Sequence, residues 1–268
     1  MVLARRFEDL TSATLRERAG AMARAVAVLP IAAVEQHGEH LPLGTDAMIA
    51  DAMVARTISR LAGDLEAVFL PVLRIGTSDE HLNFPGTLSL DWRTGAETLI
   101  RLGEGVARAG FTRMAIVSSH GGNTQVMEIA ALDLRRRFGM LCATASWSRF
   151  GLPPGLVEEG EAAIGIHGGL VETALMMAFR PDLVRLERTV PRASLQSRLI
   201  AERTHLRAHG RLGFGWLAED LNPVGTVGDG TSATAEIGAA IADHQSAGFA
   251  ALLADIAALK WPPAPVQN

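Results

Sequence analysis

Two histidines and several carboxylates lie in a short stretch that begins almost entirely apolar. In IAAVEQHGEHLPLGTDAMIAD, residues 31–51, Glu35 and His37 follow the apolar run, and the loop LPLGT then leads to Asp46. Glu35 and His37 are separated by one residue, so in an extended strand both side chains point to the same face. Carboxylate and imidazole ligands together suit Zn, Mn or Fe rather than Ca or Mg. The stretch therefore indicates a transition-metal site.

Two later segments offer further ligands. SSHGGN contains His120, and IHGGLVET contains His167 and Glu172. With His120 and either His167 or Glu172 added, the chain has enough ligands for two metal ions about 3.5–4 Å apart. Because such a pair lowers the pKa of a bridging water, these residues together indicate hydrolysis.

Other polar residues of the first stretch need not bind metal. His40 is predicted to orient a ligand from outside the coordination shell, as hydrogen-bonding partners of metal ligands commonly do. Glu39 and Asp51 are predicted to be solvated carboxylates. A polar network without any metal is the main alternative explanation for Glu35 and His37.

His81 and Asn123 each have two interpretations. His81, in SDEHLNFPGTLSLD, either lines a pocket or belongs to a polar loop that turns at FPGT. Asn123, the last residue of HGGN, either supports the site or is the N-cap of the following helix. Both remain candidate residues beside the metal ligands or in the substrate pocket.

The elements that must position these residues alternate along the chain. Apolar runs predict strands at 25–34, 67–76, 114–119 and 140–147. Helical periodicity predicts helices at 46–63, 91–110, 123–139, 168–179 and 234–259, with Thr45 or Asp46 as the N-cap of the first. This order is typical of an α/β fold with a mostly parallel sheet, in which ligands bind at the carboxyl ends of the strands. No linker divides the chain, so a single domain over 1–268 is expected.

Composition limits the partners. The net charge is −4 and Lys260 is the single lysine, so nucleic acid is not an expected partner. No apolar run approaches the ~20 residues of a membrane span, and the N-terminus lacks a signal-peptide pattern. The lone Cys142 excludes an internal disulfide, and we expect a cytoplasmic protein without a membrane partner.

The polar segments, together with EHLNFPGTLSL and VGDGTSAT, resemble the creatininase (creatinine amidohydrolase) family. The resemblance is to the branch with HGGN, which also includes mycofactocin-type peptidases and formamide deformylases. It implies a three-layer αβα sandwich, two divalent metal ions and a homo-oligomer, often a hexamer. The ions of this family are usually zinc or manganese, and iron is a third option for these ligands.

The family's residues match this chain one by one. Its metal ligands match Glu35, His37, Asp46 and His120. Asp46 matches the bridging carboxylate, Glu172 a glutamate ligand of the HGGN branch, and His167 a histidine for proton transfer. Gly122 stands where creatininases have the glutamate of H-x-E-N, which counts against creatinine itself as the substrate.

Ligands and resemblance together predict a metal-dependent amidohydrolase. It would cleave a non-standard C–N amide bond, cyclic or linear, in a small-molecule substrate by means of a metal-activated hydroxide. One alternative is a peptidase that trims a short modified peptide. A second is a non-catalytic interaction protein that a fully coordinated metal stabilises.

Overall fold

A four-stranded parallel sheet lies at the centre of the computed structural model, which describes residues 3–189, 193–210 and 212–262. The strands are β1 (Val26–Ile31), β2 (Ala67–Phe69), β3 (Arg113–Ser118) and β4 (Leu141–Ser146), in the spatial order β2-β1-β3-β4. Every residue of β1 is buried, because this strand has neighbours on both sides and helices above and below. The buried sheet therefore supports the polar loops that follow its strands.

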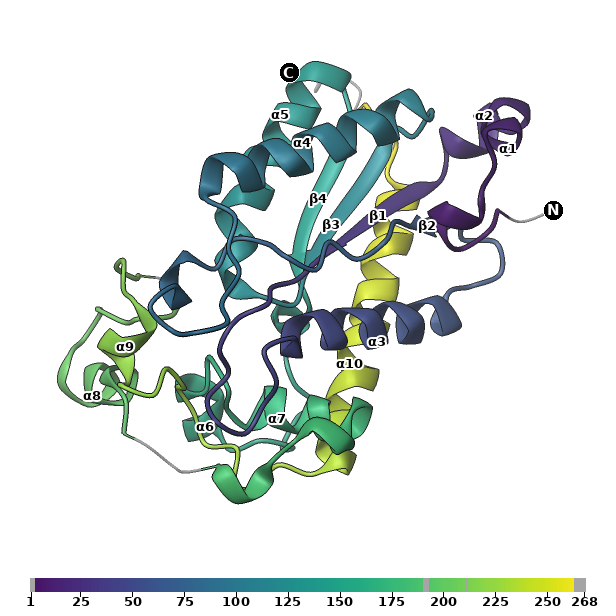
Figure 1. The fold of residues 1–268 in the computed structure, drawn as a ribbon. Coiled ribbons are helices and arrows are strands. Elements are labelled where there is room, and N and C mark those ends of the chain that lie inside the picture. Colours follow the sequence, from purple (N-terminus) through teal and green to yellow (C-terminus); the bar gives the residue numbers. More distant parts are fainter. Residues whose placement is uncertain (1–2, 190–192, 211, 263–268) are drawn as a thin grey trace.

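Helices cover both faces of the sheet (Figure 1). One face carries α4 (Trp92–Arg108) and α5 (Thr124–Phe138), which share a hydrophobic cluster with the sheet. The opposite face carries α3 (Thr45–Arg60), α7 (Leu170–Phe179) and α10 (Ala235–Ala258), which share a second cluster. This arrangement confirms the predicted three-layer α/β sandwich.

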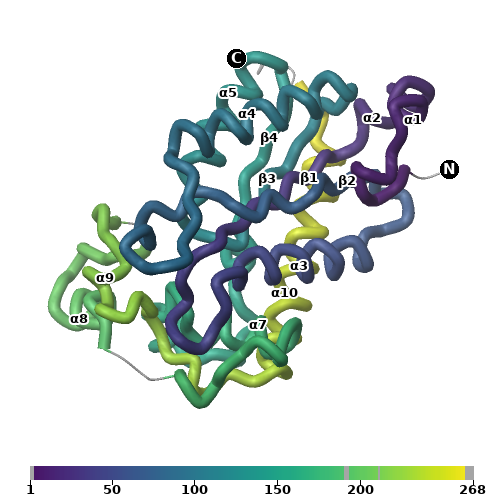
Figure 2. Tube along the Cα trace, viewed as in Figure 1, coloured from purple at the N-terminus to yellow at the C-terminus, as the bar shows by residue number. Residues whose placement is uncertain are grey.

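The remaining helices are short. They are α1 (Ser12–Glu17), α2 (Ala19–Met22), α6 (Glu159–Ile164), α8 (Leu195–Glu202) and α9 (Ala218–Leu221). Of these, α8 and α9 lie beyond the end of the sheet where β1 and β3 finish (Figure 2). Among the described residues, no helix has the length and apolar character needed to cross a membrane.

The packing of α7 against α10 depends on a glycine. A Cβ at Gly238 of α10 would overlap the backbone oxygen of Ala174 in α7, so only glycine allows the two helices to come this close. This contact fixes α7 over the sheet. The first turn of α7, which carries Glu172, is thereby held beside the ends of the strands.

Two predicted strands end earlier than expected. The run 25–34 is a strand only to Ile31, where pairing with β3 ends at Ser118. The run 67–76 is a strand only to Phe69: Leu70 still donates to the oxygen of Val28 at 2.8 Å, but Pro30 of β1 has no N–H to donate to the next oxygen of the ladder. The segment that carries Glu35 and His37 is therefore an irregular loop rather than an extended strand end.

Candidate metal centre

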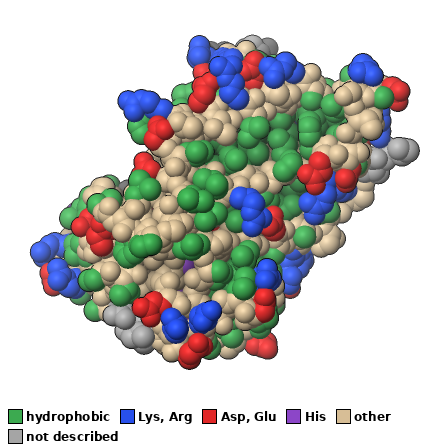
Figure 3. All heavy atoms as spheres, viewed as in Figure 1, with side chains coloured by type: hydrophobic (Ala, Val, Ile, Leu, Met, Phe, Trp, Pro, Cys, Tyr) green, Lys and Arg blue, Asp and Glu red, His purple; other side chains and the backbone are tan. Residues whose placement is uncertain are grey.

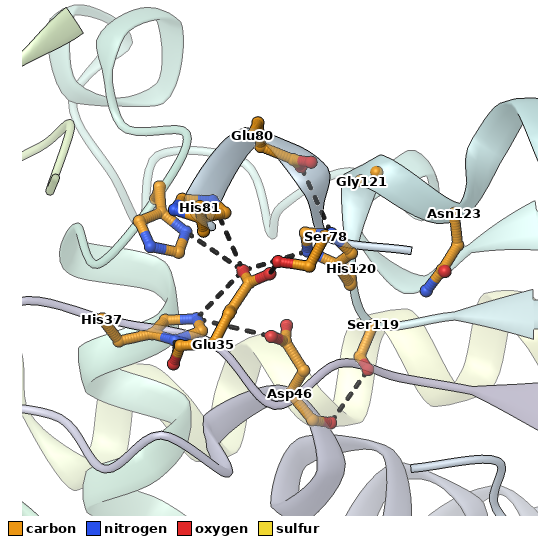
Figure 4. Close-up of polar contacts among 12 residues, drawn as sticks. Glu35, His37, Asp46, Ser78, Glu80, His81, Ser119, His120, Gly121 and Asn123 are labelled. Carbon is orange, nitrogen blue, oxygen red and sulfur yellow. Dashed lines mark hydrogen bonds and ion pairs between the residues drawn. The ribbon is translucent and has the colours of Figure 1, made fainter. Parts of the chain in front are cut away.

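The five predicted ligands come together at the carboxyl end of the sheet, and Figure 4 labels all of them except Glu172. They are Glu35 and His37 after β1, Asp46 in the first turn of α3, His120 after β3, and Glu172 in the first turn of α7. Because β1 and β3 are neighbours in the sheet, the segments that leave them start side by side. The convergence follows from this topology.

The predicted helix cap near Asp46 was wrong. Gly44 occupies the N-cap position of α3, and no side chain caps the helix there. The side chain of Asp46 instead points into the cluster, and its backbone oxygen accepts a hydrogen bond from Ser119 Oγ at 2.8 Å. A carboxylate in the first turn is still favoured by the helix dipole.

Glu35, Asp46 and His120 form the first ligand triad, whose ligand atoms lie within 4.8 Å of one another. Glu35 Oε1 is 3.1 Å from His120 Nδ1. All three residues are buried, with 0%, 1% and 6% of their surface exposed. This triad is closed to solvent.

His37, Asp46 and Glu172 form the second triad, again with ligand atoms within 4.8 Å. His37 Nε2 lies 3.5 Å from Asp46 Oδ2 and 3.7 Å from Glu172 Oε2. His37 Nδ1 donates to the backbone oxygen of Glu35 at 3.1 Å, which leaves the lone pair of Nε2 directed at the carboxylates. The two triads share Asp46, as a bridging carboxylate would require.

Several buried polar atoms of these triads have no hydrogen-bond partner within the described part of the chain. They are Glu35 Oε1, His37 Nε2, both carboxylate oxygens of Asp46, and His120 Nε2. Leaving such atoms unpaired in the interior is costly, and native structures rarely do so. Divalent cations would satisfy most of them, and the mixed nitrogen and oxygen donors suit zinc, manganese or iron. The residues present thus fit a metal centre.

Burial and mutual charge shift the pKa values of this cluster in opposite directions. Burial and the charge of Glu35 raise the pKa of Asp46 well above its usual value. Burial alone would raise the pKa of Glu35, but the positive charge of His120 and the contact with it hold that pKa well below its usual range. Burial alone would lower the pKa of His120, yet Glu35 and Glu80 raise it well above normal. In the absence of metal, a proton on His120 thus supplies part of the missing positive charge.

Two further histidine rings, those of His167 and His81, lie in a row with the ring of His37. The ring of His167 is 4.3 Å from that of His37 and 4.2 Å from that of His81, centroid to centroid. Burial lowers the pKa of each, and for His81 burial together with His167 lowers it to about 2. All three rings are therefore neutral at physiological pH.

Hydrogen bonds fix which ring nitrogen of His167 carries the proton. His167 Nε2 lies 2.7 Å from the backbone oxygen of Gln36, so this nitrogen donates. The other nitrogen, Nδ1, keeps its lone pair and faces Glu35 Oε1 at 3.6 Å. His167 also forms a possible ligand group with Glu35 and His37, so the structure places it directly at the cluster.

Gln36 is a residue that the sequence analysis missed. Its amide nitrogen donates to His81 Nδ1 at 2.9 Å and to the oxygen of Gly225 at 3.0 Å. His81 Nε2 consequently carries the ring proton and faces Glu35 Oε1 at 3.6 Å. Strand alternation would turn Gln36 away from Glu35, but the chain is irregular here, and Gln36 is buried with the histidines.

His40 and Asn123 lie outside the triads. His40 is buried, and its Nε2 lies 3.0 Å from the hydroxyl of Thr173, the residue after Glu172. Asn123 occupies the N-cap position of α5 but does not cap it. Its side chain instead accepts from the backbone N–H of Thr77 at 2.9 Å and donates to the oxygen of Ala32 at 3.0 Å.

Three further acidic residues lie near the site or in the stretch that leads to it. Glu39 and Asp51 are exposed, as predicted, and Asp51 pairs with Arg74. One unpredicted acidic residue does approach the cluster, since Glu80 Oε1 lies 3.3 Å from His120 Nε2. No metal-ligand spacing in the sequence pointed to Glu80, because a one-turn helix and not a strand end delivers it.

Comparison with known proteins places the chain in context. A family model described as "Creatininase: Creatinine amidohydrolase" matches residues 8–253. A mycofactocin precursor peptide peptidase of Mycolicibacterium smegmatis is 32% identical over 219 residues, which cover 79% of this chain and 77% of that protein. A creatinine amidohydrolase of Pseudomonas putida is 32% identical over 181 residues, covering 62% and 68% of the two chains.

The fold is also similar to solved structures. A manganese form of creatininase superposes with a TM-score of 0.75 and 26% sequence identity. The superposition covers 97% of this chain and all of the other.

Proposed function

Because the chain belongs to the creatininase family, we propose that it is a metal-dependent amidohydrolase that cleaves a non-standard C–N amide bond, cyclic or linear, in a small molecule. The observation that carries this proposal is the pair of ligand triads that share Asp46. Two-metal centres of this kind are suited to hydrolysis. The family is one of hydrolases that act on carbon–nitrogen bonds.

Each triad would hold one divalent ion. Glu35 and His120 would complete one coordination shell with Asp46, and His37 and Glu172 the other. Zinc or manganese is the proposed metal, with iron as a third option; the manganese form of a related creatininase supports manganese. When bound, the two ions would supply an activated water and polarise the amide carbonyl.

His167 is the proposed proton carrier. Its Nε2–H is held by the backbone oxygen of Gln36, so the free lone pair of Nδ1 points into the cluster. A ring that burial keeps neutral can take a proton at Nδ1 and then readily gives it up, because the environment disfavours the imidazolium. His167 would thus pass a proton to the leaving nitrogen.

A peptidase that trims a short modified peptide is the second candidate. It is favoured because the mycobacterial peptidase aligns with more of this chain than the Pseudomonas creatinine amidohydrolase does. Gly122, in place of the glutamate expected of a creatininase, points the same way. A fully coordinated, non-catalytic site is disfavoured by Glu172, whose side chain is 21% exposed and leaves one side of the cluster open.

The decisive experiment combines metal analysis with a substrate screen. The purified chain should contain up to two divalent ions, and removing them with a chelator should lower its melting temperature. Protein loaded with Zn²⁺ or Mn²⁺ is then tested on creatinine, formamides and short peptides, with chelated protein as the control. Metal-dependent hydrolysis of one class supports the proposal. A metal-free chain whose stability a chelator does not change would refute it.

Other expectations from the sequence stay predictions. They are a single domain over 1–268, a cytoplasmic location and a homo-oligomer, a hexamer being the form common in the family. Of the predicted domain, residues 1–2, 190–192, 211 and 263–268 lie outside the described residues. On the face shown in Figure 3, basic and acidic side chains are interspersed and hydrophobic side chains gather between them. That surface offers no continuous basic area for nucleic acid and leaves apolar area for a subunit contact.

A further inference from the structure

Glu80 and His81 leave the same one-turn helix, η2 (Asp79–His81), toward different parts of the metal centre. His81 turns toward Glu35 and Gln36. Glu80 turns toward His120, with Oε1 at 3.3 Å from Nε2 (Figure 4). A single turn of chain therefore brings a carboxylate to the outer edge of the His120 ring.

The two ring nitrogens of His120 face two different carboxylates. Nδ1 is 3.1 Å from Glu35 Oε1, inside the first triad. Nε2 points away from that triad and faces Glu80, and it has no aligned hydrogen bond within the described residues. If Nδ1 is the atom that binds the ion, the ring proton must be on Nε2, and the Glu80 carboxylate is in position to accept a hydrogen bond from it.

The space for the Glu80 carboxylate depends on Gly122. A Cβ at position 122 would lie 2.6 Å from Glu80 Oε1 and 2.9 Å from the backbone oxygen of Thr77, and it would overlap His120 Nε2. A side chain at 122 and the carboxylate of Glu80 therefore compete for the same volume. Gly121, one residue earlier, has open space around its own Cβ position.

From this geometry we propose that Glu80 is a positioning residue: it orients His120 through Nε2 so that Nδ1 presents its lone pair to the ion shared by Glu35 and Asp46. The inference rests on the proposed metal-dependent function. Carboxylates that hold the second nitrogen of a ligating histidine fix its tautomer and make it a stronger ligand. Glu80 would accept the proton of Nε2 when Nδ1 holds the ion.

Glu80 acts through His120 and not as a ligand itself. None of the metal-ligand groups among the described residues includes it, whereas His120 belongs to the first triad. Its side chain is 20% exposed and lies on the side of His120 opposite Glu35. A role in positioning therefore accounts for its place better than direct coordination.

The test measures metal binding rather than turnover. Co²⁺ and Zn²⁺ are titrated into the metal-free chain in competition with a chromophoric chelator, and the visible absorption of bound Co²⁺ reports the ligand geometry. Glu80→Ala should weaken binding at the site of Glu35, Asp46 and His120 about 10–100-fold and change the Co²⁺ spectrum of that site. Glu80→Gln keeps an oxygen that accepts from Nε2–H, so it should recover most of the affinity.

Asp79→Ala is the matched control. Asp79 belongs to the same turn, but its carboxylate accepts from Ser89 Oγ at 2.7 Å and does not face His120. Wild-type affinity in this variant together with a loss in Glu80→Ala supports the proposal. Unchanged binding in Glu80→Ala, or an equal loss in Asp79→Ala, overturns it while leaving the proposed function intact. A wild-type chain that binds neither ion overturns both.

Discussion

The two halves of the metal centre share Asp46 but are built differently. In the His120 half, formed by Glu35, Asp46 and His120, Glu35 accepts from the hydroxyl of Ser78 and lies against the rings of His81 and His167. In the Glu172 half, formed by His37, Asp46 and Glu172, the Glu172 carboxylate accepts from the backbone N–H of Gly168 at 2.6 Å. The Glu172 side chain is also the exposed one.

This difference indicates that the two halves have different roles. A ligand set that is buried and held on all sides resists exchange of its ion, as structural sites do. A ligand set with one open side leaves a position for water or substrate. We therefore expect the ion in the His120 half to bind more tightly, and the substrate to approach through the Glu172 half.

The largest effect is expected from Asp46→Asn, because Asp46 belongs to both halves. A neutral amide cannot bridge two cations, so metal content should fall in both sites and hydrolysis should drop to background. The metal-free variant should melt no lower than the wild type, because burial and Glu35 disfavour the Asp46 charge. Metal analysis, an activity assay and calorimetry check this, and wild-type activity would rule out the bridging role.

Glu172→Gln should affect one half and spare the other. The Glu172 half loses a charged ligand, so its ion affinity should fall by more than the roughly 10–100-fold typical of an outer partner. The His120 half keeps all its ligands, and metal content should fall from two ions to one. Glu39→Gln, an exposed carboxylate of the neighbouring loop, is the control. Equal loss from both halves would show that they are not independent.

Gly122→Ala should disturb the His120 half by crowding. The new methyl group would press on the His120 ring and on Glu80, with an expected loss of about 1–3 kcal/mol in the free energy of unfolding. The affinity of the His120 half should fall, whereas that of the Glu172 half should hold. Gly121→Ala meets nothing and should stay within about 0.5 kcal/mol of the wild type in thermal unfolding. Equal effects of the two variants would contradict the crowding argument.

The sequence could predict the layers of the fold and the meeting of the first ligands. Apolar runs and helical periodicity indicate the parallel sheet, and the carboxyl ends of its strands bring Glu35 and His120 to one edge. The choice of Glu172 over His167 as the fifth ligand came from the resemblance rather than from spacing. Glu172 lies on α7, which packs on the opposite face of the sheet from α5. No local sequence pattern indicates that a residue so far along the chain returns to Glu35 and His120.

The supporting residues could not be predicted in this way. Gln36 lies on irregular backbone and Glu80 on a one-turn helix, where side-chain direction follows no period of two or 3.6 residues. The short helices α6, α8 and α9 have too few residues for a periodic signal to develop. The periodicity of the sequence therefore does not predict the contacts that hold the ligands in place.

The smallest effect is expected from Glu161→Gln, because Glu161 is connected to the Glu172 half only through its hydrogen bond to Leu170, the first residue of α7. Glu161 Oε1 accepts from the N–H of Leu170 at 3.2 Å and from that of Asp229 at 3.0 Å. Burial raises the pKa of Glu161, so between its usual value and the raised one the folded state binds more protons than the unfolded state. Stability contributed by Glu161 must then fall as pH rises through that window.

Glutamine keeps an acceptor oxygen at this position but does not titrate. Melting of the metal-free chain from pH 4 to 8 should therefore show Glu161→Gln gaining on the wild type as pH rises, by about 1 kcal/mol or less, the scale of one hydrogen bond. Glu159→Gln, exposed on the same helix, should follow the wild type. Ion affinity of the Glu172 half should change little, because Gly168 still donates to Glu172. A loss of stability at every pH would instead mean that the N–H groups of Leu170 and Asp229 need a charged carboxylate as their acceptor. The bond from Leu170 would then support the Glu172 half more strongly than its length of 3.2 Å suggests.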